Sequence, residues 1–190
     1  MITFVATAYN EKEEIHVFLS CLIAQTNKNW KCVVFCDGEN EYIKNAIQNL
    51  NDIRVSYQSS NTKRGFWGHY SRIDALYNFV DTDYVIQTSI QDYYSPNMVM
   101  DVMDLIIKHN PDFIYFDCVH NHFNYDVLRC ELKRARIDWG CFVIKTLLAK
   151  NIGINQPESD QCDGIFVEDS IRKYPNMKII KINKILTVHN

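Results

Sequence analysis

The fold is decided by residues 2–38, ITFVATAYNEKEEIHVFLSCLIAQTNKNWKCVVFCDG. Residues 2–6 are a short apolar run typical of a buried strand. Residues 11–26 begin with acidic side chains, which a helix dipole favours at that end, and their apolar side chains then recur along one helical face. Residues 30–38 are a second apolar run that stops at Asp-Gly. The stretch therefore predicts a strand, a helix and a second strand.

The alternation of strand and helix continues outward from this unit. Residues 41–50 predict a helix and residues 53–59 a third strand. A further helix over 71–80 leads to a fourth strand over 83–90, and a polar loop over 91–97 follows it. Such alternation favours parallel strands joined by right-handed crossovers. We predict an α/β fold with a Rossmann-like, mostly parallel central sheet flanked by helices.

The second half of the chain is less regular. Residues 120–136 fit neither a helical nor a strand pattern. The elements predicted around them are a helix over 97–110, a strand over 112–119, a strand running into a helix over 137–153, a loop and helix over 162–175, and one or two strands over 177–190.

Length and composition narrow the function classes. A chain of 190 residues with 47% hydrophobic side chains predicts one packed domain. The net charge of −3 provides no general attraction to nucleic acid. No apolar run approaches the roughly 20 residues that span a bilayer, so we expect no transmembrane segment, and the N-terminus does not read as a signal peptide.

The cysteines are expected to be reduced core residues of a cytoplasmic protein. The chain has seven, most of them within apolar runs such as KCVVFC and CFVI. Buried free cysteine packs like a small hydrophobic side chain. No CxxC pair is present, which argues against a structural zinc site.

Complementary polar side chains follow four predicted strands. Ligands of open α/β sheets bind at the carboxyl ends of the strands. There, Tyr9 offers a flat face to a base, and Asp37 offers an acceptor for the imide N–H of uracil or thymine. Arg64 and Arg72 offer charge to phosphate, and Asp92 offers a hard oxygen to Mg²⁺ or Mn²⁺. Singly, each could be a turn former or surface cation; together they predict a nucleotide-diphosphate site.

The chain also contains an Asp-x-Asp sequence, at residues 81–83. Asp81 and Asp83 precede the apolar run of the fourth strand. They therefore belong to the amino end of that strand, on the far side of the sheet. We interpret them as turn residues and not as metal ligands.

The order of these motifs resembles that of family 2 glycosyltransferases. Residues 5–41 are similar to the family's opening strand, Tyr-Asn-acid turn, helix and strand ending in Asp-Gly. RGFWGHYSRIDAL, residues 64–76, is similar to its Gly-rich segment with an arginine opening a helix. SIQDYYSP, residues 89–96, stands where the family has its metal motif. Residues 166–190 resemble its late Glu-Asp helix, closing strand and terminal histidine.

The resemblance implies a GT-A fold and an enzyme. The expected reaction is inverting transfer of a sugar from a nucleoside-diphosphate donor, taken as UDP-linked, to a hydroxyl of a glycan, with Mn²⁺ or Mg²⁺. It implies one domain over 1–190, with a nucleotide-binding half at 1–96 and an acceptor half at 97–190. The acceptor half is short for the family, so the chain could work within a larger chain or as a homo-oligomer.

Residue roles follow from the same resemblance. Asp169 is the implied general base and Asp92 the implied metal ligand, and His189 is an added metal or phosphate contact. Ser89 and Gln91 replace two acids of the family's metal motif, which leaves metal dependence open. The residues expected to bind nucleotide and donor are Thr7, Ala8, Tyr9, Glu11, Asp37, Gly38, Arg64, Gly65, Arg72 and Gln91.

Other residues of the second half are candidates on their chemistry. Asp163 is a second candidate base, and it could equally be a turn former. Asp138 combines a carboxylate with the aromatic Trp139, so both, with Gly140, are expected near the donor sugar or acceptor. A buried core tryptophan is the competing interpretation. Glu168 is also placed on the acceptor side, although it and Asp169 could be helix-start acids.

Histidines and aromatics complete the candidates. His120 and His122 would share one face of a strand, and we expect a loop or acceptor-rim role and not a zinc site. Phe66, Trp67 and Tyr70 could form a lid over the donor or could simply pack.

Two other functions compete with a glycosyltransferase. The depleted metal motif would suit a non-catalytic nucleotide-sugar or glycan-binding module. A sugar nucleotidyltransferase would share the first half of the fold. Such enzymes usually carry Gly, Arg and Lys after the first strand, where this chain has the acidic TAYNEKEE.

Overall fold

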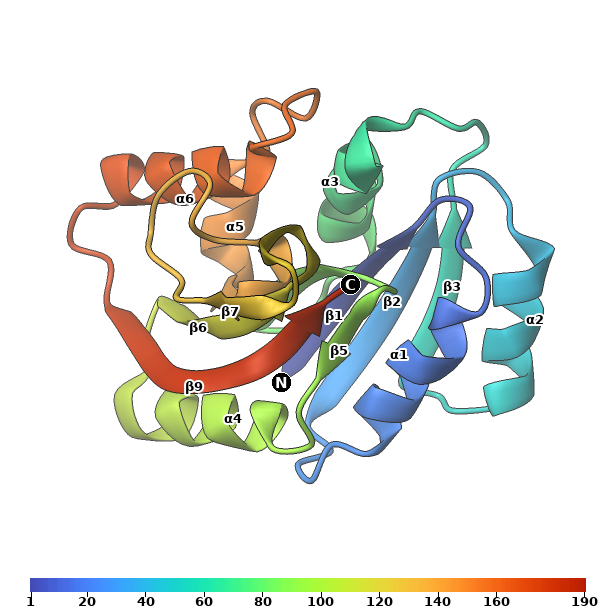
Figure 1. Cartoon of the computed structure of the whole chain (residues 1–190), viewed down its shortest axis with the longest axis horizontal. Helices are drawn as coiled ribbons and strands as arrows, with labels where there is room; N and C mark the ends of the chain where they lie inside the picture. Colours follow the sequence, from blue (N-terminus) through green and yellow to red (C-terminus); the bar gives the residue numbers. More distant parts are fainter.

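A nine-stranded curled sheet runs through the computed structural model, which describes residues 1–190 (Figure 1). Its strands are β1 (Ile2–Ala8), β2 (Trp30–Cys36), β3 (Val55–Ser59), β4 (Tyr84–Ser89), β5 (Asp92–Tyr94), β6 (Phe113–His120), β7 (Asp126–Leu128), β8 (Phe142–Lys145) and β9 (Ile179–His189). They lie in the order β3-β2-β1-β4-β8-β6-β9-β5, with β7 paired to β6.

Helices cover both faces of the sheet (Figure 1). The helices are α1 (Glu14–Ile23), α2 (Glu41–Leu50), α3 (His69–Phe79), α4 (Met98–His109), α5 (Thr146–Ile152) and α6 (Cys162–Lys173), with short 3-10 turns η1 (Phe66–Gly68), η2 (Asn121–Phe123) and η3 (Trp139–Cys141). Helices α1, α2 and α4 pack on one face, and α3, α5 and α6 on the other. None of the helices has the length and apolar character needed to cross a membrane.

The strand–helix alternation of the first half is confirmed. Strand β1 pairs in parallel with β2 and β4, and β2 pairs in parallel with β3. In the second half, β8 runs antiparallel to β4 and β6, while β9 runs parallel to β6. The predicted α/β fold with a parallel central sheet is therefore present, and its carboxyl edge is built by the first half.

One predicted loop is partly a strand. Residues 91–97 were expected to be polar loop, yet Asp92–Tyr94 form β5, antiparallel to the end of β9. A strand of three residues carries too little periodicity to show in a sequence. Its partner stands far along the chain, so this pairing is set by tertiary structure.

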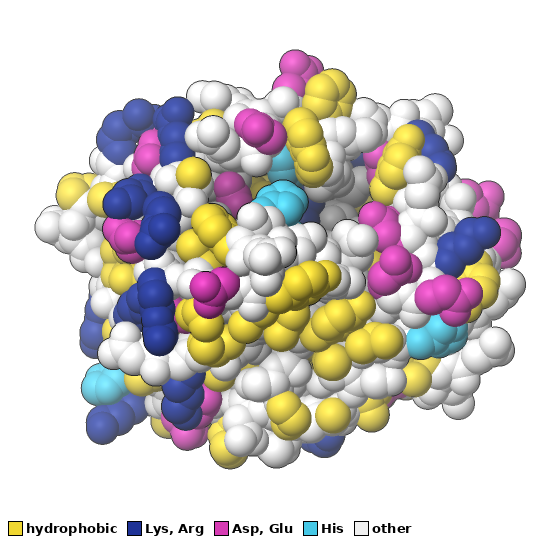
Figure 2. Space-filling model, viewed as in Figure 1, with side chains coloured by type: hydrophobic (Ala, Val, Ile, Leu, Met, Phe, Trp, Pro, Cys, Tyr) yellow, Lys and Arg dark blue, Asp and Glu magenta, His cyan; other side chains and the backbone are white.

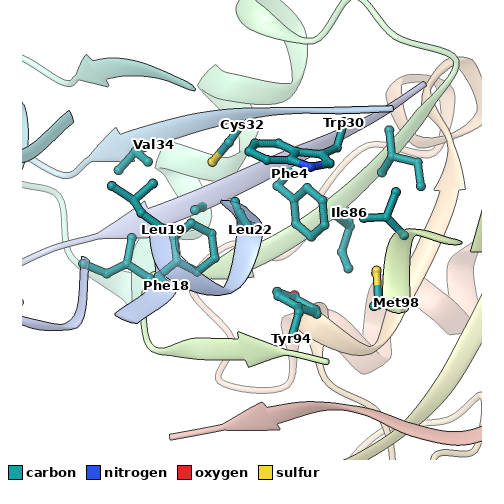
Figure 3. Packing of buried hydrophobic residues seen from close by; sticks show 14 of the residues in the cluster. Phe4, Phe18, Leu19, Leu22, Trp30, Cys32, Val34, Ile86, Tyr94 and Met98 are labelled. Atoms are coloured by element: carbon teal, nitrogen blue, oxygen red, sulfur yellow. The ribbon is translucent and has the colours of Figure 1, made fainter. Parts of the chain in front are cut away.

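A cluster of large apolar side chains holds β5 over the sheet. Phe4 of β1 and Tyr94 of β5 meet edge to face, with ring centroids 5.2 Å apart. Trp30 and Phe18 pack into the same cluster from β2 and α1 (Figure 3). Burial on this scale contributes roughly 1.5–3 kcal/mol per large side chain. The cluster thereby fixes the position of Asp92, two residues before Tyr94.

Helix α6 begins earlier than the sequence predicts. Cys162-Asp163-Gly164 was interpreted as a loop, but α6 starts at Cys162. Position 164 requires glycine because a Cβ there would lie 2.5 Å from Arg134 Cα. Glycine here permits a close approach of two backbones and is not a turn signal. The prediction that Asp169 heads this helix is therefore wrong; Asp163 lies in its first turn.

Candidate functional site

Four segments meet at the carboxyl edge of the parallel strands. Thr7 of β1 pairs with Ser89 of β4, and Ala8 pairs with Cys36 of β2. The loop before α3 packs onto the same edge, because a Cβ on Gly68 would lie 2.9 Å from Thr7 Oγ1. The segments that the sequence assigned to one site are thus adjacent. Figure 2 shows this face hollowed near its centre, with a histidine beside the hollow.

Asp37 is the anchor of the loop over residues 60–65. Its carboxylate is 1% exposed and accepts the backbone amides of Arg64 at 3.0 Å and Gly65 at 2.6 Å. The hydroxyl of Ser60 donates to it at 3.2 Å. Both oxygens are therefore occupied by the loop. The carboxylate shapes the rim of the predicted base site rather than facing it with a free acceptor.

Tyr9 presents an exposed ring at this rim. The residue is 40% exposed, and the ammonium of Lys63 lies 4.5 Å from its ring centroid. The Lys63 stem also lies against Gly38, where a Cβ would come within 2.7 Å. The Tyr9 amide donates to Glu11 Oε2 at 2.5 Å, which fixes the turn after β1. The flat aromatic surface expected next to a base is present.

Arg72 is a buried cation at the centre of the site. Its guanidinium donates to the carbonyl oxygens of Trp67 at 2.6 Å and Thr88 at 3.1 Å. Burial lowers the pKa of Arg72, and the negative charges of Asp138 and Asp92 oppose that effect. Arg64 is less buried and pairs with Asp74 at 2.7 Å. Of the two arginines, Arg72 is therefore the one aimed into the cluster of acids.

Asp92 is the buried carboxylate of this edge. It is 1% exposed, and its Oδ2 accepts from the Thr88 hydroxyl at 2.5 Å and the Ser89 amide at 2.8 Å. Its Oδ1 lies 2.7 Å from His189 Nδ1. Burial alone would raise the pKa of Asp92, but the hydrogen bond to His189 lowers it. The side chain of Gln91 lies just before Asp92 and takes no part in these bonds.

His189, Asp138 and His120 gather beside Asp92. Asp138 Oδ1 lies 3.8 Å from His189 Nδ1, and Asp138 Oδ2 lies 3.9 Å from His120 Nε2. Burial alone would lower the pKa of His189, but the bond to Asp92 and the charge of Asp138 raise it to about 9. The sequence did not place His120 here, because only the parallel pairing of β6 with β9 brings it opposite His189.

Asp163 completes the cluster from the first turn of α6. Burial and the charge of Asp138 together raise the pKa of Asp163 to about 7, although Arg72 opposes this. A carboxyl group with such a pKa is half ionised near neutral pH, which is the condition for an effective general base. Of the two candidate bases, Asp163 is the one whose pKa responds to the charges of Asp138 and Arg72.

Asp169 and Glu168 face away from the cluster. Asp169 accepts from Asn155 Nδ2 at 3.0 Å and pairs with Arg172 on its own helix. Glu168 accepts from the Arg134 amide at 3.0 Å and its guanidinium at 2.8 Å. Both carboxylates are tied to cations or amides near the surface. The structure thus does not bring Asp169 next to Arg72 and Asp92.

Trp139 belongs to the core and Gly140 to the site. Trp139 is 4% exposed, and its ring lies among Phe142 and Phe166. It offers no open face to a sugar. A Cβ on Gly140 would lie 2.9 Å from Asp92 Oδ2, so glycine lets η3 approach that carboxylate. Trp67, whose carbonyl accepts from Arg72, has an exposed side chain, at 64%.

Asp81 and Asp83 lie at the opposite edge of the sheet. Asp81 pairs with Lys31 at 2.9 Å, near the start of β2, and Asp83 lies 3.7 Å from the N-terminal amine. Both side chains are mostly exposed. This placement agrees with the interpretation that they are turn residues.

We predict that Asp81→Asn leaves UDP affinity unchanged. Its ion pair with Lys31 is exposed, and such pairs contribute about 1 kcal/mol or less. Calorimetric titration of UDP into the variant, with Mn²⁺, checks this. A large loss of affinity would show that the metal site lies at the amino edge.

An open pocket of about 310 Å³ lies apart from the acidic cluster. It lies between the end of β3 and α3 and is lined by Ser60, Thr62, Arg64, Asp74 and others. Ser60 and Arg64 also contact Asp37, so this pocket adjoins the loop that Asp37 anchors.

The donor atoms near Asp92 fit a hard divalent cation. Two carboxylates, Asp92 and Asp138, converge on one imidazole, and such oxygen and nitrogen ligands suit Mn²⁺ or Mg²⁺. The proton on His189 offsets one of these two negative charges, and metal binding would displace it. His120 Nδ1 accepts the His122 amide at 3.1 Å, which places the proton of a neutral ring on Nε2. The Nε2 proton therefore lies on the side of Asp138, at a distance of 3.9 Å between Nε2 and Oδ2 that is too long for a hydrogen bond.

Comparisons with known proteins bear on the family and the fold. Residues 3–158 match the profile of the family described as Glycosyl transferase family 2. A search of curated protein sequences gave no match.

Solved structures share the fold at low sequence identity. The structure of S. aureus TarS 1-349 superposes with a TM-score of 0.81 at 16% identity, covering 100% of this chain and 60% of that one. TarS 1-349 in complex with UDP-GlcNAc gives 0.79 at 18%, covering 98% and 57%. The mannosyltransferase PcManGT from Pyrobaculum calidifontis, in complex with GDP-Man and Mn²⁺, gives 0.77 at 14%, covering 98% and 56%. The chain thus spans less than two thirds of these proteins.

Proposed function

This chain belongs to glycosyltransferase family 2, and from that premise we propose that it transfers a sugar from a UDP-linked donor to a hydroxyl of a glycan. The observation that carries the proposal is the cluster at the carboxyl edge of the sheet. There a buried arginine, Arg72, lies among the carboxylates of Asp92, Asp138 and Asp163. A buried cation beside acids suits a reaction in which a diphosphate leaves and a proton is taken up.

The base and ribose would lie over the turn after β1. Tyr9 offers its ring, and Thr7, Ala8 and Glu11 build the turn that holds it. Asp37 would act indirectly, by holding the backbone of Arg64 and Gly65 at the edge of the nucleobase. The choice of uridine is supported by the similarity to TarS, whose structures hold UDP and UDP-GlcNAc.

Asp163 is our proposed general base. Its carboxylate would take the proton of the acceptor hydroxyl while that oxygen attacks the anomeric carbon of the donor sugar. The bond from this carbon to the diphosphate breaks, and the nucleoside diphosphate leaves with the bonding electrons. A single displacement of this kind inverts the anomeric configuration. Burial and Asp138 make Asp163 basic enough to accept the proton near neutral pH.

The leaving diphosphate would be stabilised by positive charge at two places. Arg72 supplies a buried guanidinium, and Arg64 a second one at the rim. A divalent metal, when bound, would compensate charge on the diphosphate, held by Asp92, Asp138 and His189. Since Ser89 and Gln91 bring no carboxylate, Asp138 would restore the second negative ligand.

The acceptor would approach from the second half of the chain. We propose the division into a nucleotide half at 1–96 and an acceptor half at 97–190, with Asp163 and Gly140 at their boundary. Trp67 lies exposed at the donor side of the hollow and could close over the sugar.

The proposed base predicts an acid limb in the pH profile. Only ionised Asp163 can accept the acceptor's proton, and its pKa is raised to about 7. We expect kcat/KM to fall about tenfold per pH unit below that pKa and to level off above it. Initial rates measured between pH 5 and 9 check this, in Asp169→Asn as a matched control. A flat profile through pH 6–7 would contradict the assignment.

Donor hydrolysis separates this function from a non-catalytic binding module. The replaced acids at Ser89 and Gln91 are the feature that favours a module. A transferase should slowly hydrolyse its UDP-sugar in the presence of Mn²⁺, because water can take the place of the acceptor. A panel of UDP-sugars, each assayed for released UDP, tests this. Binding of UDP without any hydrolysis or transfer would indicate a module.

A further inference from the structure

Three cysteines from separate elements lie close together in the core. Cys118 lies in β6, Cys130 follows β7, and Cys141 ends η3. Their three sulfur atoms all lie within 4.8 Å of one another, and all three residues are buried. Absence of a CxxC pair argued against a zinc site in the sequence. The CxxC rule considers only cysteines that are close in sequence, so it does not detect a group that the fold brings together from β6, the segment after β7 and η3.

The spacing of the sulfurs is close to that of a metal-thiolate site. Zinc–sulfur bonds of about 2.3 Å in tetrahedral geometry place sulfurs about 3.8 Å apart. The observed group therefore needs contraction of about 1 Å at most to close on one ion. The three thiols therefore already lie close enough together to share one ion. Deprotonated sulfur is the form that binds metal.

The backbone of Cys130 is fixed by charged neighbours. Its amide donates to Asp117 Oδ1 at 2.9 Å, and its carbonyl accepts from Lys181 Nζ at 2.9 Å. Arg129 pairs with Asp117 at 2.8 Å. Asp117 and Lys181 thus fix the backbone of Cys130, and Arg129 pairs with Asp117.

We propose that Cys118, Cys130 and Cys141 form a buried three-thiolate site for a thiophilic metal ion such as Zn²⁺. Complete burial favours this over a redox sensor, whose cysteines need solvent access. Soft thiolate ligands select zinc and its heavier relatives over Mg²⁺ or Mn²⁺. A bound ion would clamp η3, whose preceding residue Asp138 accepts the Gly140 amide at 2.8 Å. The bound ion would thus help to hold Asp138 in position.

Cadmium is the probe for this site, because its bonds to thiolate give an ultraviolet charge-transfer absorption. We expect the reduced full chain to bind one equivalent of Cd²⁺ with this absorption and to unfold at a higher temperature. Cys130→Ala and Cys141→Ala should lose both effects. Alanine is chosen because these positions are apolar and small. Cys32→Ala, at a buried cysteine of β2 outside the group, is the matched control and should keep both.

The wild-type spectrum decides the proposal even if a variant fails to fold. A wild-type chain without thiolate absorption at one equivalent of Cd²⁺ would overturn it. So would an absorption that survives in the Cys130 and Cys141 variants and disappears in Cys32→Ala. The oxygen and nitrogen ligands of the proposed Mn²⁺ site give no such absorption. Failure here is therefore distinguishable from failure of UDP binding.

Discussion

Replacing Asp163 by asparagine will lower sugar transfer by a factor of about 100 or more while UDP affinity stays unchanged. The amide keeps the size of the side chain and cannot accept the proton of the acceptor hydroxyl. Asp163 lies in the first turn of α6, beside Asp138 and Arg72, and not against the turn after β1 where the base would bind. Initial transfer rates and calorimetric UDP titrations of the same preparation measure both quantities.

The stability of this variant separates catalysis from misfolding. Burial and Asp138 raise the pKa of Asp163 to about 7 in the folded protein. Its ionisation therefore costs stability progressively as the pH rises from the unfolded pKa toward about 7, and by the full amount above it. Asparagine removes this repulsion, and the unfolding temperature at pH 8 should equal or exceed that of the wild type. Asp169→Asn is the matched control in the same helix and should keep most of the activity. If Asp163→Asn turned over normally and Asp169→Asn did not, the base would be Asp169.

Replacing Asp92 by asparagine will remove most of the strengthening of UDP binding by Mn²⁺. Losing a ligand or its partner typically lowers metal affinity by about 10- to 100-fold. The amide oxygen can still accept from Thr88 and the Ser89 amide, so the local fold should persist. The variant lacks the negative charge that pairs with His189. Titration of UDP with and without Mn²⁺ gives the metal-dependent part directly.

The exposed variant Asp81→Asn is the control for this experiment. It removes one carboxylate of the same kind at the opposite edge of the sheet, where Asp81 pairs with Lys31. An Asp92 variant that kept the full effect of Mn²⁺ would exclude Asp92 as a ligand. Circular dichroism of both variants shows whether any loss is local.

Much of the fold could be predicted from local patterns. The strands over Ile2–Ala8 and Trp30–Cys36 are buried apolar runs, and their helices are amphipathic. Parallel connection then places Tyr9, Asp37 and Asp92 at one edge without further information. The same logic separated Asp92 from Asp81, because each lies at a different end of β4.

The remaining parts depend on contacts between distant segments. His189 reaches Asp92 across 97 positions, through the pairing of β9 with β5. His120 joins them only because β6 lies beside β9. Gly164 was interpreted as a turn because its packing against Arg134 leaves no mark in the local pattern. That interpretation placed the start of this helix after residue 164, whereas α6 begins at Cys162.

Calorimetric titration of UDP, with and without Mn²⁺, tests the proposed donor site most directly. The arrangement of Tyr9, Arg72 and Asp92 predicts that UDP binds and that Mn²⁺ strengthens the binding. Absence of binding by UDP, and also by GDP and dTDP, with or without Mn²⁺, would contradict a nucleotide-diphosphate site at this edge of the sheet.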